Sequence, residues 1–214
     1  MKALNLYACL GGNRYKWTDC EVTAVELDSE LARMYQERFP NDTVIIADAH
    51  QYLLDHYKEF DFIWSSPPCP SHSKSRFWAY GKTMPIYPDM KLYEEIIFLQ
   101  HHALENQKWV IENVNGYYEP LIKATKRGRH LFWTNFNFPI INQKDNTGVM
   151  NWESKFEPLK QYHHITNFDY KGEQSRLKIL RNLVDSEVGK IIFNAAKGII
   201  EKQNVNQTSI FDEL

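Results

Sequence analysis

The sequence contains few cysteines, no long apolar segment and almost no net charge. Its three cysteines, Cys9, Cys20 and Cys69, are too few and odd in number for a framework of disulfide bonds. Apolar runs fall well short of the ~20 residues that a membrane-spanning helix requires, and the start of the chain lacks the pattern of a signal peptide. We therefore expect a cytoplasmic protein with reduced thiols and no membrane association.

The formal net charge of −2 provides no overall basic field for binding nucleic acid. Residues 62–88 and 120–144, however, contain no Asp or Glu. Their basic residues are Lys74, Arg76, Lys82, Lys123, Lys126, Arg127, Arg129 and Lys144. Because phosphate binding requires only a local basic surface, these two segments are candidates for contact with nucleic acid.

Short apolar segments alternate with helical patterns over the first half of the chain. The pattern predicts strands at 4–8, 21–27, 43–47, 60–65 and 109–112, with helices at 29–39, 49–58 and 91–105. This alternation predicts a doubly wound, mostly parallel α/β sheet. Residues 139–172 show no clear period. A last helix begins near Asp185, and its apolar face, which includes Val188, Ile192 and Ile199, is expected to pack on the core.

Three features follow the ends of the first three predicted strands, where ligands bind in open α/β sheets. Gly11 and Gly12 follow the first strand, and glycines allow a ligand to approach the backbone closely. Glu26 ends the second strand, a usual place for a carboxylate that accepts hydrogen bonds from ribose, and Asp48 follows the third. Glycine pairs also form ordinary turns, and strand-end acids also cap helices, but the three together favour an adenosine-containing ligand.

The fourth predicted strand runs into a Pro-Pro-Cys-Pro sequence at 67–70, in which the prolines restrict the backbone around Cys69. A cysteine nucleophile needs electropositive surroundings, because the thiolate is the reactive form. We expect His72, Lys74 and Arg76 to supply that charge. The alternative is a buried structural cysteine.

Glu112 ends the fifth predicted strand, which is expected to lie beside the fourth. A glutamate at this place, with its pKa raised by burial, can hold a proton against a nitrogen atom of a nucleobase. A helix cap or a salt-bridged surface acid is the alternative interpretation.

These features stand in the order of a known set of motifs. The segments 6–12, 67–69, 112–114, 127–129 and 175–184, together with Glu26 and Asp48, resemble the motifs of the cytosine-C5 DNA methyltransferase family. The Pro-Pro-Cys and Glu-Asn-Val sequences, at this spacing and order, are the specific part. The resemblance implies a Rossmann-like fold that binds S-adenosylmethionine (SAM), in a small member of the family of phage, prophage or orphan type.

The resemblance also implies roles for individual residues. Cys69 adds to C6 of a cytosine flipped out of double-stranded DNA, Glu112 holds N3, and C5 then accepts the methyl group of SAM. Arg127 and Arg129 contact the target cytosine and its phosphate. The residues implied to surround SAM are Tyr7, Ala8, Leu10, Gly11, Gly12, Glu26, Leu27, Asp48, Ala49, Pro67, Asn182 and Val184.

Several positions depart from the family's pattern. Tyr7 and Cys9 replace the usual Phe and Gly at the first motif, and Leu27 stands where an aromatic ring often stacks on adenine. Pro70 replaces the usual Gln after the nucleophile. In the last motif, Arg181 and Leu183 stand where Gly and Ser are frequent.

The largest departure is the short recognition region. The implied division is a SAM-binding catalytic core at 1–138, a reduced target-recognition region at 139–172, the last-motif part of the core at 173–202 and a flexible tail at 203–214. We expect aromatic residues of the recognition region, such as Trp152, Tyr162, His163 and Tyr170, to reach base edges. The residues expected to contact nucleic acid are Ser71, His72, Lys74, Arg76, Lys126, Lys155 and Lys160. No metal-binding motif is present, since His163 and His164 have no further ligands at suitable spacing.

The segment 207–211, Gln-Thr-Ser-Ile-Phe, resembles the short peptides that dock on bacterial sliding clamps. The resemblance implies contacts through Gln207, Ile210 and Phe211. If so, the clamp tethers the protein to newly replicated DNA by raising its effective concentration there.

Three other interpretations of the whole chain stay open. A tRNA-modifying branch of the same family has nearly the same catalytic motifs. A catalytically silent DNA-binding relative keeps the fold, although it does not need Cys69, Glu112 and Arg129 together. A hydride-transferring Rossmann enzyme is the third, but the Pro-Pro-Cys loop has no role in it. The target sequence, the oligomeric state and the physiological role are beyond the sequence.

Overall fold

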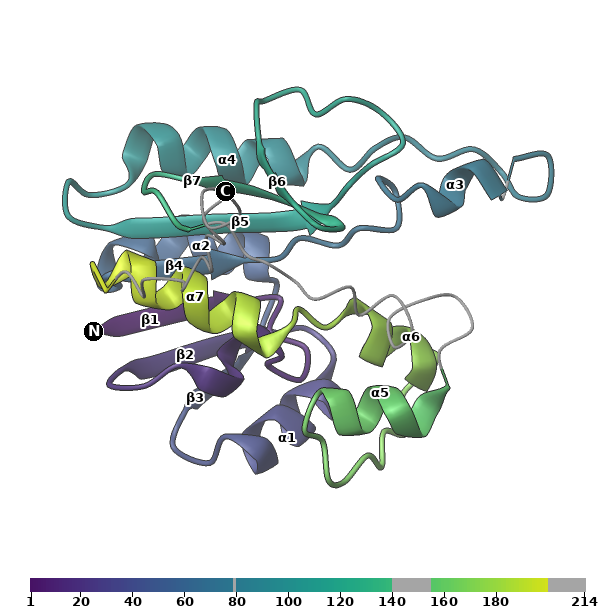
Figure 1. Ribbon diagram of the computed structural model, residues 1–214, viewed down its shortest axis with the longest axis horizontal. Coiled ribbons are helices and arrows are strands. Elements are labelled where there is room, and N and C mark those ends of the chain that lie inside the picture. The colour runs from purple at the N-terminus through teal and green to yellow at the C-terminus, as the bar shows by residue number, and fades with distance from the viewer. Residues whose placement is uncertain (79, 140–154, 200–214) are drawn as a thin grey trace, which may run out of the picture.

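The computed structural model describes residues 1–78, 80–139 and 155–199 (Figure 1). Within them lies one seven-stranded sheet in the order β3-β2-β1-β4-β5-β7-β6. Its strands are β1 (Lys2–Leu6), β2 (Glu21–Glu26), β3 (Thr43–Ile46), β4 (Phe62–Ser65), β5 (Lys108–Val114), β6 (Thr125–Arg127) and β7 (His130–Thr134). Strands β1 to β5 pair in parallel, whereas β7 is antiparallel to both of its neighbours. This is the predicted doubly wound, mostly parallel, Rossmann-like α/β fold.

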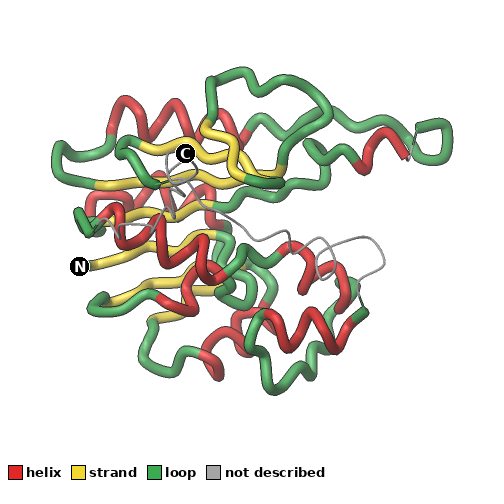
Figure 2. The backbone as a smooth tube through the Cα atoms, in the orientation of Figure 1, coloured by secondary structure: helices red, strands yellow, loops and turns green. Residues whose placement is uncertain are grey.

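Helices cover both faces of the sheet, as they must when parallel strands are buried (Figures 1 and 2). The helices are α1 (Ser29–Arg38), α2 (Ala49–His56), α3 (Ser75–Trp78), α4 (Lys91–His102), α5 (Phe156–Tyr162), α6 (Arg176–Asn182) and α7 (Ser186–Ala196). Two short 3-10 turns are also present: η1 (Asn13–Lys16) lies between β1 and β2, and η2 (Tyr57–Glu59) lies between α2 and β4.

Alternate side chains of the strands point to two separate apolar layers. On one face, Ile63 and Ile111 pack with Leu53 of α2 and Ile96 of α4. On the other, Phe62, Trp64 and Val110 pack with Ile192 and Phe193 of α7. Both layers are closed to water, so the polar groups that remain accessible collect where the strands end.

Aspartates begin three of the helices. The side chain of Asp28 accepts hydrogen bonds from the backbone of Glu30 and Leu31, and that of Asp185 accepts from Glu187 and Val188. Asp48 caps α2 in the same way through the backbone N–H of Gln51. These caps satisfy N–H groups that the first turn of a helix leaves unpaired, and they confirm the predicted starts of α1 and α7.

The structure differs from the predicted elements at several places. The first strand ends at Leu6, because Tyr7 and Cys9 have positive φ angles of 55° and 48°. Strands β6 and β7 were not predicted, and α5 lies in the segment predicted to be irregular. Ile199 is 48% exposed beyond the end of α7, so the prediction that it packs on the core is wrong.

The described part of the predicted recognition region shares a core with the rest of the chain. Leu159 of α5 and Phe168 are buried together with Leu10 and Met34. His163 and Tyr170 are 2% and 6% exposed, so neither side chain is available to reach base edges as predicted. Trp152 lies outside the described residues, as does the whole segment that contains Gln207, Ile210 and Phe211. None of the described helices is long and apolar enough to cross a membrane.

Candidate active site

The loop that carries Cys69 is held against the end of β5. Asn113, which is 2% exposed, donates a hydrogen bond from Nδ2 to the carbonyl oxygen of Pro67 over 3.0 Å. On the other side of the nucleophile, the backbone N–H groups of His72 and Ser73 both donate to the carbonyl oxygen of Cys69 at 3.0 Å. These bonds hold the Cys69 backbone from both directions, so its thiol is presented by a rigid turn beyond β4.

Glu112 lies in the same site, at the end of β5. Its side chain is buried, and burial raises its pKa to about 7, as the sequence predicts. A hydrogen bond with Ser66 and the charge of Arg129 oppose that rise in pKa. Oε1 of Glu112 lies 3.7 Å from Nε2 of His130, whose pKa burial lowers to about 3. Since His130 is then neutral near pH 7, it does not hold Glu112 as a carboxylate, and Glu112 is present in both its protonated and its ionised form.

Charges around Cys69 act in both directions. Burial raises the pKa of its thiol and the negative charge of Glu112 raises it further, whereas Lys178 and Arg129 lower it. The predicted suppliers of positive charge were His72, Lys74 and Arg76, and this prediction is wrong. His72 is buried, and its Nδ1 lies 2.6 Å from the hydroxyl of Tyr118.

Arg129 and Arg127 have different surroundings, although both were predicted to act on the target base. Nη2 of Arg129 donates to the carbonyl oxygen of Arg181 over 2.8 Å. Although the residue reaches solvent, desolvation of its guanidinium lowers the pKa, while Glu112 and Cys69 raise it. Arg127 instead lies 5.5 Å from the ring centroid of Phe138 and lines a separate hollow of about 390 Å³ with Asn135. Of these two arginines, Arg129 is therefore the one whose charge acts on Cys69 and Glu112.

A cavity of about 740 Å³ lies at the carboxyl ends of β2 and β3. Five of the residues predicted to bind the cofactor line it, and these are Tyr7, Glu26, Leu27, Asp48 and Ala49. Pro68 also lines it, so the cavity adjoins the loop of the nucleophile. Its volume lies within the range of ordinary small-molecule sites.

Glu26 is positioned by the backbone around it. Its Oε2 accepts a hydrogen bond from the N–H of Cys9 over 2.8 Å, and its Oε1 accepts from Asp28 over 2.9 Å. Burial raises the pKa of Glu26, and these two bonds oppose the rise. Each carboxylate oxygen can accept a second bond, so Glu26 can receive hydroxyl donors from a molecule in the cavity.

Residues 1–84 match a family model described as C-5 cytosine-specific DNA methylase. The match covers less than half of the 214 residues. The match includes Cys69 and the first three strand ends. No curated protein matches the chain.

Among solved structures, the chain is similar to DNMT2 from Spodoptera frugiperda, with 20% identity and a TM-score of 0.44 over 68% of this chain and 53% of that one. It is also similar to the methyltransferase EhMeth from Entamoeba histolytica, with 11% identity and a TM-score of 0.45 over 73% of this chain and 62% of that one. A third similar structure is the Dnmt2 methyltransferase of S. pombe, with 17% identity and a TM-score of 0.42 over 56% of this chain and 36% of that one. The chain thus spans about half the length (53%) of the Spodoptera protein.

The glycines of the first family motif serve packing rather than ligand approach. A Cβ atom on Gly11 would lie 2.5 Å from the ring of Phe39, and one on Gly12 would lie 2.5 Å from the carbonyl oxygen of Val184. Gly11 also has a φ of +64°, which side chains disfavour. Phe39 and Val184 thus account for a glycine at each of these two positions, and neither glycine lines the cavity.

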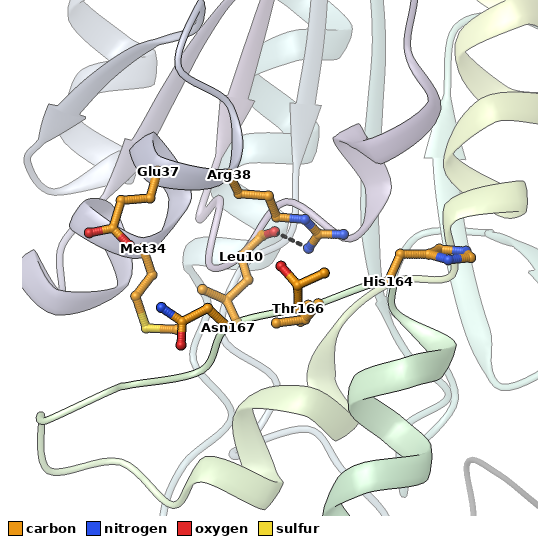
Figure 3. Close-up of a pocket in the computed structure, with 8 residues that line it drawn as sticks. Leu10, Met34, Glu37, Arg38, His164, Thr166 and Asn167 are labelled. Carbon is orange, nitrogen blue, oxygen red and sulfur yellow. Dashed lines mark hydrogen bonds between the residues drawn. The ribbon is translucent and has the colours of Figure 1, made fainter.

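Leu10 lies in a different hollow, of about 110 Å³, shown in Figure 3. Its carbonyl oxygen accepts a hydrogen bond from Nη1 of Arg38 over 2.7 Å, and Nη2 of Arg38 bonds to the carbonyl oxygen of His163. Arg38 therefore joins the first motif to the segment after α5. Met34 and Asn167 also line this hollow (Figure 3), and none of its lining residues lines the larger cavity.

Four further residues predicted to bind the cofactor do not line the cavity. Ala8 and Val184 are buried in the apolar core. Pro67 is buried, with its carbonyl oxygen bonded to Asn113, and the neighbouring Pro68 takes its place at the cavity. Asn182 is exposed at the end of α6. The motifs indicated the segments that surround the cavity, but not which side chains of those segments face the cavity and which face the core.

The sequence did not identify several residues of the cavity wall. They include Asp28, Asp89, Lys91, Tyr170 and Gln174. The hydroxyl of Tyr170 donates to Oδ2 of Asp28 over 2.6 Å, so residues far apart in the chain close one side of the cavity. Asp28 was recognised only as a helix cap, and no signal in the sequence paired it with Tyr170.

A buried carboxylate behind the cavity was also missed. Glu95 of α4 is 1% exposed and accepts hydrogen bonds from the hydroxyl of Tyr7 and from Oγ of Ser65, both over 2.6 Å. Nδ1 of His50 lies 3.0 Å from Oε1 of Glu95, and this contact raises the pKa of His50. Glu95 thus connects the ends of β1 and β4 with the start of α2, and positions Tyr7 at the cavity.

The residues predicted to contact nucleic acid fall into two groups. Ser71 and His72 are buried, and Oγ of Ser71 accepts a hydrogen bond from the N–H of Asp89, so both have structural roles instead. The rest lie at or near the surface: Lys74, Arg76, Lys126, Lys155 and Lys160. Of these, Lys160 lies 3.5 Å from Glu157 on its own helix, which lowers its value as a phosphate contact.

Proposed function

We propose that the chain transfers a methyl group from SAM to C5 of a cytosine in DNA, with Cys69 as the nucleophile. The observation that carries the proposal is the meeting of Cys69 and the raised-pKa Glu112 at adjacent strand ends, beside a cavity that Pro68 shares. The family match over residues 1–84 supports both the reaction class and DNA as the substrate.

The residues of the cavity fit SAM. Glu26 is oriented to accept hydrogen bonds from the ribose hydroxyls, and Leu27, which is 68% exposed, offers an apolar surface to adenine. Asp48 can accept from the adenine amino group, although Lys91 lies 3.7 Å from it. When bound, SAM supplies an electrophilic methyl group on a positively charged sulfur.

Cys69 and Glu112 divide the chemistry on the base. The Cys69 thiolate forms a bond from Sγ to C6 of cytosine, and the electrons of the C5–C6 double bond shift through C4 toward N3. Glu112, protonated near pH 7, donates its proton to N3 and so neutralises the charge that the addition creates. C5 is then nucleophilic and can accept the methyl group that bound SAM would supply, with S-adenosylhomocysteine as the leaving group. Loss of the C5 proton to solvent then expels Cys69 as a thiolate, and N3 returns its proton to Glu112.

The protonation of Glu112 also favours the nucleophile. A carboxylate beside Cys69 raises the pKa of the thiol, and a neutral carboxyl removes that effect. Arg129 and Lys178 then stabilise the thiolate, so the acid and the nucleophile are active in the same state of the site. Since C5 and C6 are covered inside a duplex, the cytosine must leave the base stack.

The test is transfer of labelled methyl from SAM to unmethylated DNA, supplied in duplex and single-stranded forms, followed by digestion to nucleosides. We expect 5-methylcytosine with the wild type and none with Cys69→Ala. Label that persists in Cys69→Ala refutes Cys69 as the nucleophile. A parallel reaction with tRNA decides the substrate, since label in tRNA alone would keep the chemistry and exclude DNA.

A further inference from the structure

An exposed arm follows the nucleophile loop. We define the arm as residues 74–78 and 80–88, which include α3 and project beyond the sheet on the side where the strands end (Figure 1). Aromatic side chains cover it. Tyr80 is 89% exposed and Tyr87 is 95% exposed, with Phe77 at 61% and Trp78 at 72%. Exposed aromatic groups at this density mark a binding surface rather than ordinary scatter.

The base of the arm is firmly attached. The N–H of Asp89 donates to Oγ of Ser71 over 3.0 Å, which closes the two ends of the arm on each other. The N–H of Tyr117 donates to the carbonyl oxygen of His72 over 3.0 Å, and the Phe77 ring meets the Tyr117 ring edge to face at 5.7 Å. Since His72 and Ser73 also bond to the Cys69 carbonyl, the arm is coupled directly to the nucleophile.

The charge of the arm has one sign. Residues 62–88 contain no Asp or Glu, and the arm contains Lys74, Arg76 and Lys82. Both lysines are exposed. Arg76 reaches back to the carbonyl oxygen of Met84 over 3.1 Å and so stiffens the arm. Exposed aromatic rings can stack on nucleobases, and the exposed ammonium groups between them can bind phosphates, so this surface is suited to a nucleic-acid strand.

We propose that the arm binds single-stranded DNA, with unpaired bases stacked on Tyr80 and Tyr87 and phosphates on Lys74 and Lys82. This inference rests on the proposed function and names the form of its substrate. Stacking on a protein ring requires a free base face, and in a duplex the neighbouring base pairs cover both faces. A strand held this way delivers its cytosine to Cys69 without the cost of extruding it from a duplex.

The test measures binding without catalysis. The full chain is titrated against a labelled, unstructured 20-nucleotide strand that contains cytosine, against the same strand annealed to its complement, and against the matching RNA strand. We expect the single-stranded DNA to bind more tightly than the other two. The double variant Tyr80→Ala/Tyr87→Ala should weaken its binding by about 5-fold to 150-fold for each ring removed.

Matched variants separate stacking from charge and from misfolding. Tyr80→Phe/Tyr87→Phe keeps both rings and should bind the strand as the wild type does, whereas Leu54→Ala, at an exposed apolar position on α2, should have no effect. Lys74→Gln/Lys82→Gln should flatten the slope of log K against log salt by about 1.4, that is 0.7 for each phosphate contact.

Two results would overturn the inference. One is duplex DNA or RNA that binds as tightly as the single strand, or more tightly. The other is single-strand binding that the alanine variant leaves unchanged. Both results concern affinity, so they are distinct from a failure of the proposed function. Methylation of duplex DNA without a preference for single strands supports the proposed reaction and refutes the role of the arm. Single-strand binding without any methylation supports the role of the arm and refutes the proposed reaction.

Discussion

Replacing Glu112 by glutamine should make the protein more stable at high pH and less active at every pH. The pKa of Glu112 is about 7 in the fold against 4.5 for an unperturbed glutamate. A raised pKa means that the folded state holds the proton more tightly than the unfolded state between these two values. The contribution of Glu112 to stability is therefore present at low pH and is lost as pH rises through 7.

The size of the effect follows from the two pKa values. Between pH 5 and pH 8, ionisation of Glu112 should cost the folded wild type about 2 to 3 kcal/mol relative to the unfolded chain. Gln keeps the shape of the side chain and cannot ionise. The free energy of unfolding of Glu112→Gln, measured by urea titration, should therefore gain about that amount on the wild type between the two pH values.

Activity should move in the opposite direction. Without a group that can pass a proton to N3, methyl transfer should fall by about 100-fold to 10,000-fold. Alkylation of Cys69 by iodoacetamide at pH 8 should speed up, because the charge that raises the thiol pKa is gone. A stability difference between the variant and the wild type that does not change with pH would falsify the assignment of a pKa near 7 to Glu112.

Three further changes test other parts of the structure. Burial holds the pKa of His130 at about 3, so the unfolded chain takes up the proton first as pH falls below about 6.5. Acidification from pH 7 to pH 5 should therefore lower the free energy of unfolding by about 2 kcal/mol through this residue. His130→Gln should remove that part of the pH dependence in urea titrations, and an unchanged profile contradicts the reasoning. Glu95→Gln should lower the free energy of unfolding by about 1–3 kcal/mol, because it disturbs buried hydrogen bonds from Tyr7 and Ser65. Adding Tyr7→Phe to this variant should lower stability little further, and fully additive losses in a double-mutant cycle argue against a shared network. Gly12→Ala should lower stability by about 1–3 kcal/mol, since its Cβ would lie 2.5 Å from the Val184 carbonyl oxygen. Gly12 has an ordinary φ of −57°, so alanine adds no backbone strain there, and an unchanged Tm would exclude this crowding.

Local signals in the sequence were enough for the order of the main elements from β1 to β5 and for bringing Cys69 and Glu112 together. Pro40 and Asp28 marked the limits of α1, because capping and proline effects act within a few residues. Cys69 follows β4 and Glu112 lies near the end of β5, and parallel neighbours bring such ends together. The raised pKa of Glu112 followed from the same placement.

What the sequence did not reveal depends on contacts between distant segments. Glu95 gave no sign of its role, since its partners Tyr7 and Ser65 come from two other strand ends. The close packing around Gly11 and Gly12 was not predictable, because the atoms that approach them belong to Phe39 and Val184. The short strands β6 and β7 lack a clear alternation of their own and owe their place to the edge that β5 offers.

The pairing of β4 with β5 makes catalytic competence inseparable from correct folding. Ser65 lies opposite Ile111, so the next residue, Glu112, points to the same side as Phe132 and Val110. A slip of one residue would turn every side chain of β5 to the other face. Glu112 would then enter the apolar layer beneath α2 and α4, and Ile111 would stand beside Cys69. A chain with the wrong register would thus lose the proposed site and part of its apolar core together, so correct pairing of β4 with β5 is a condition for both.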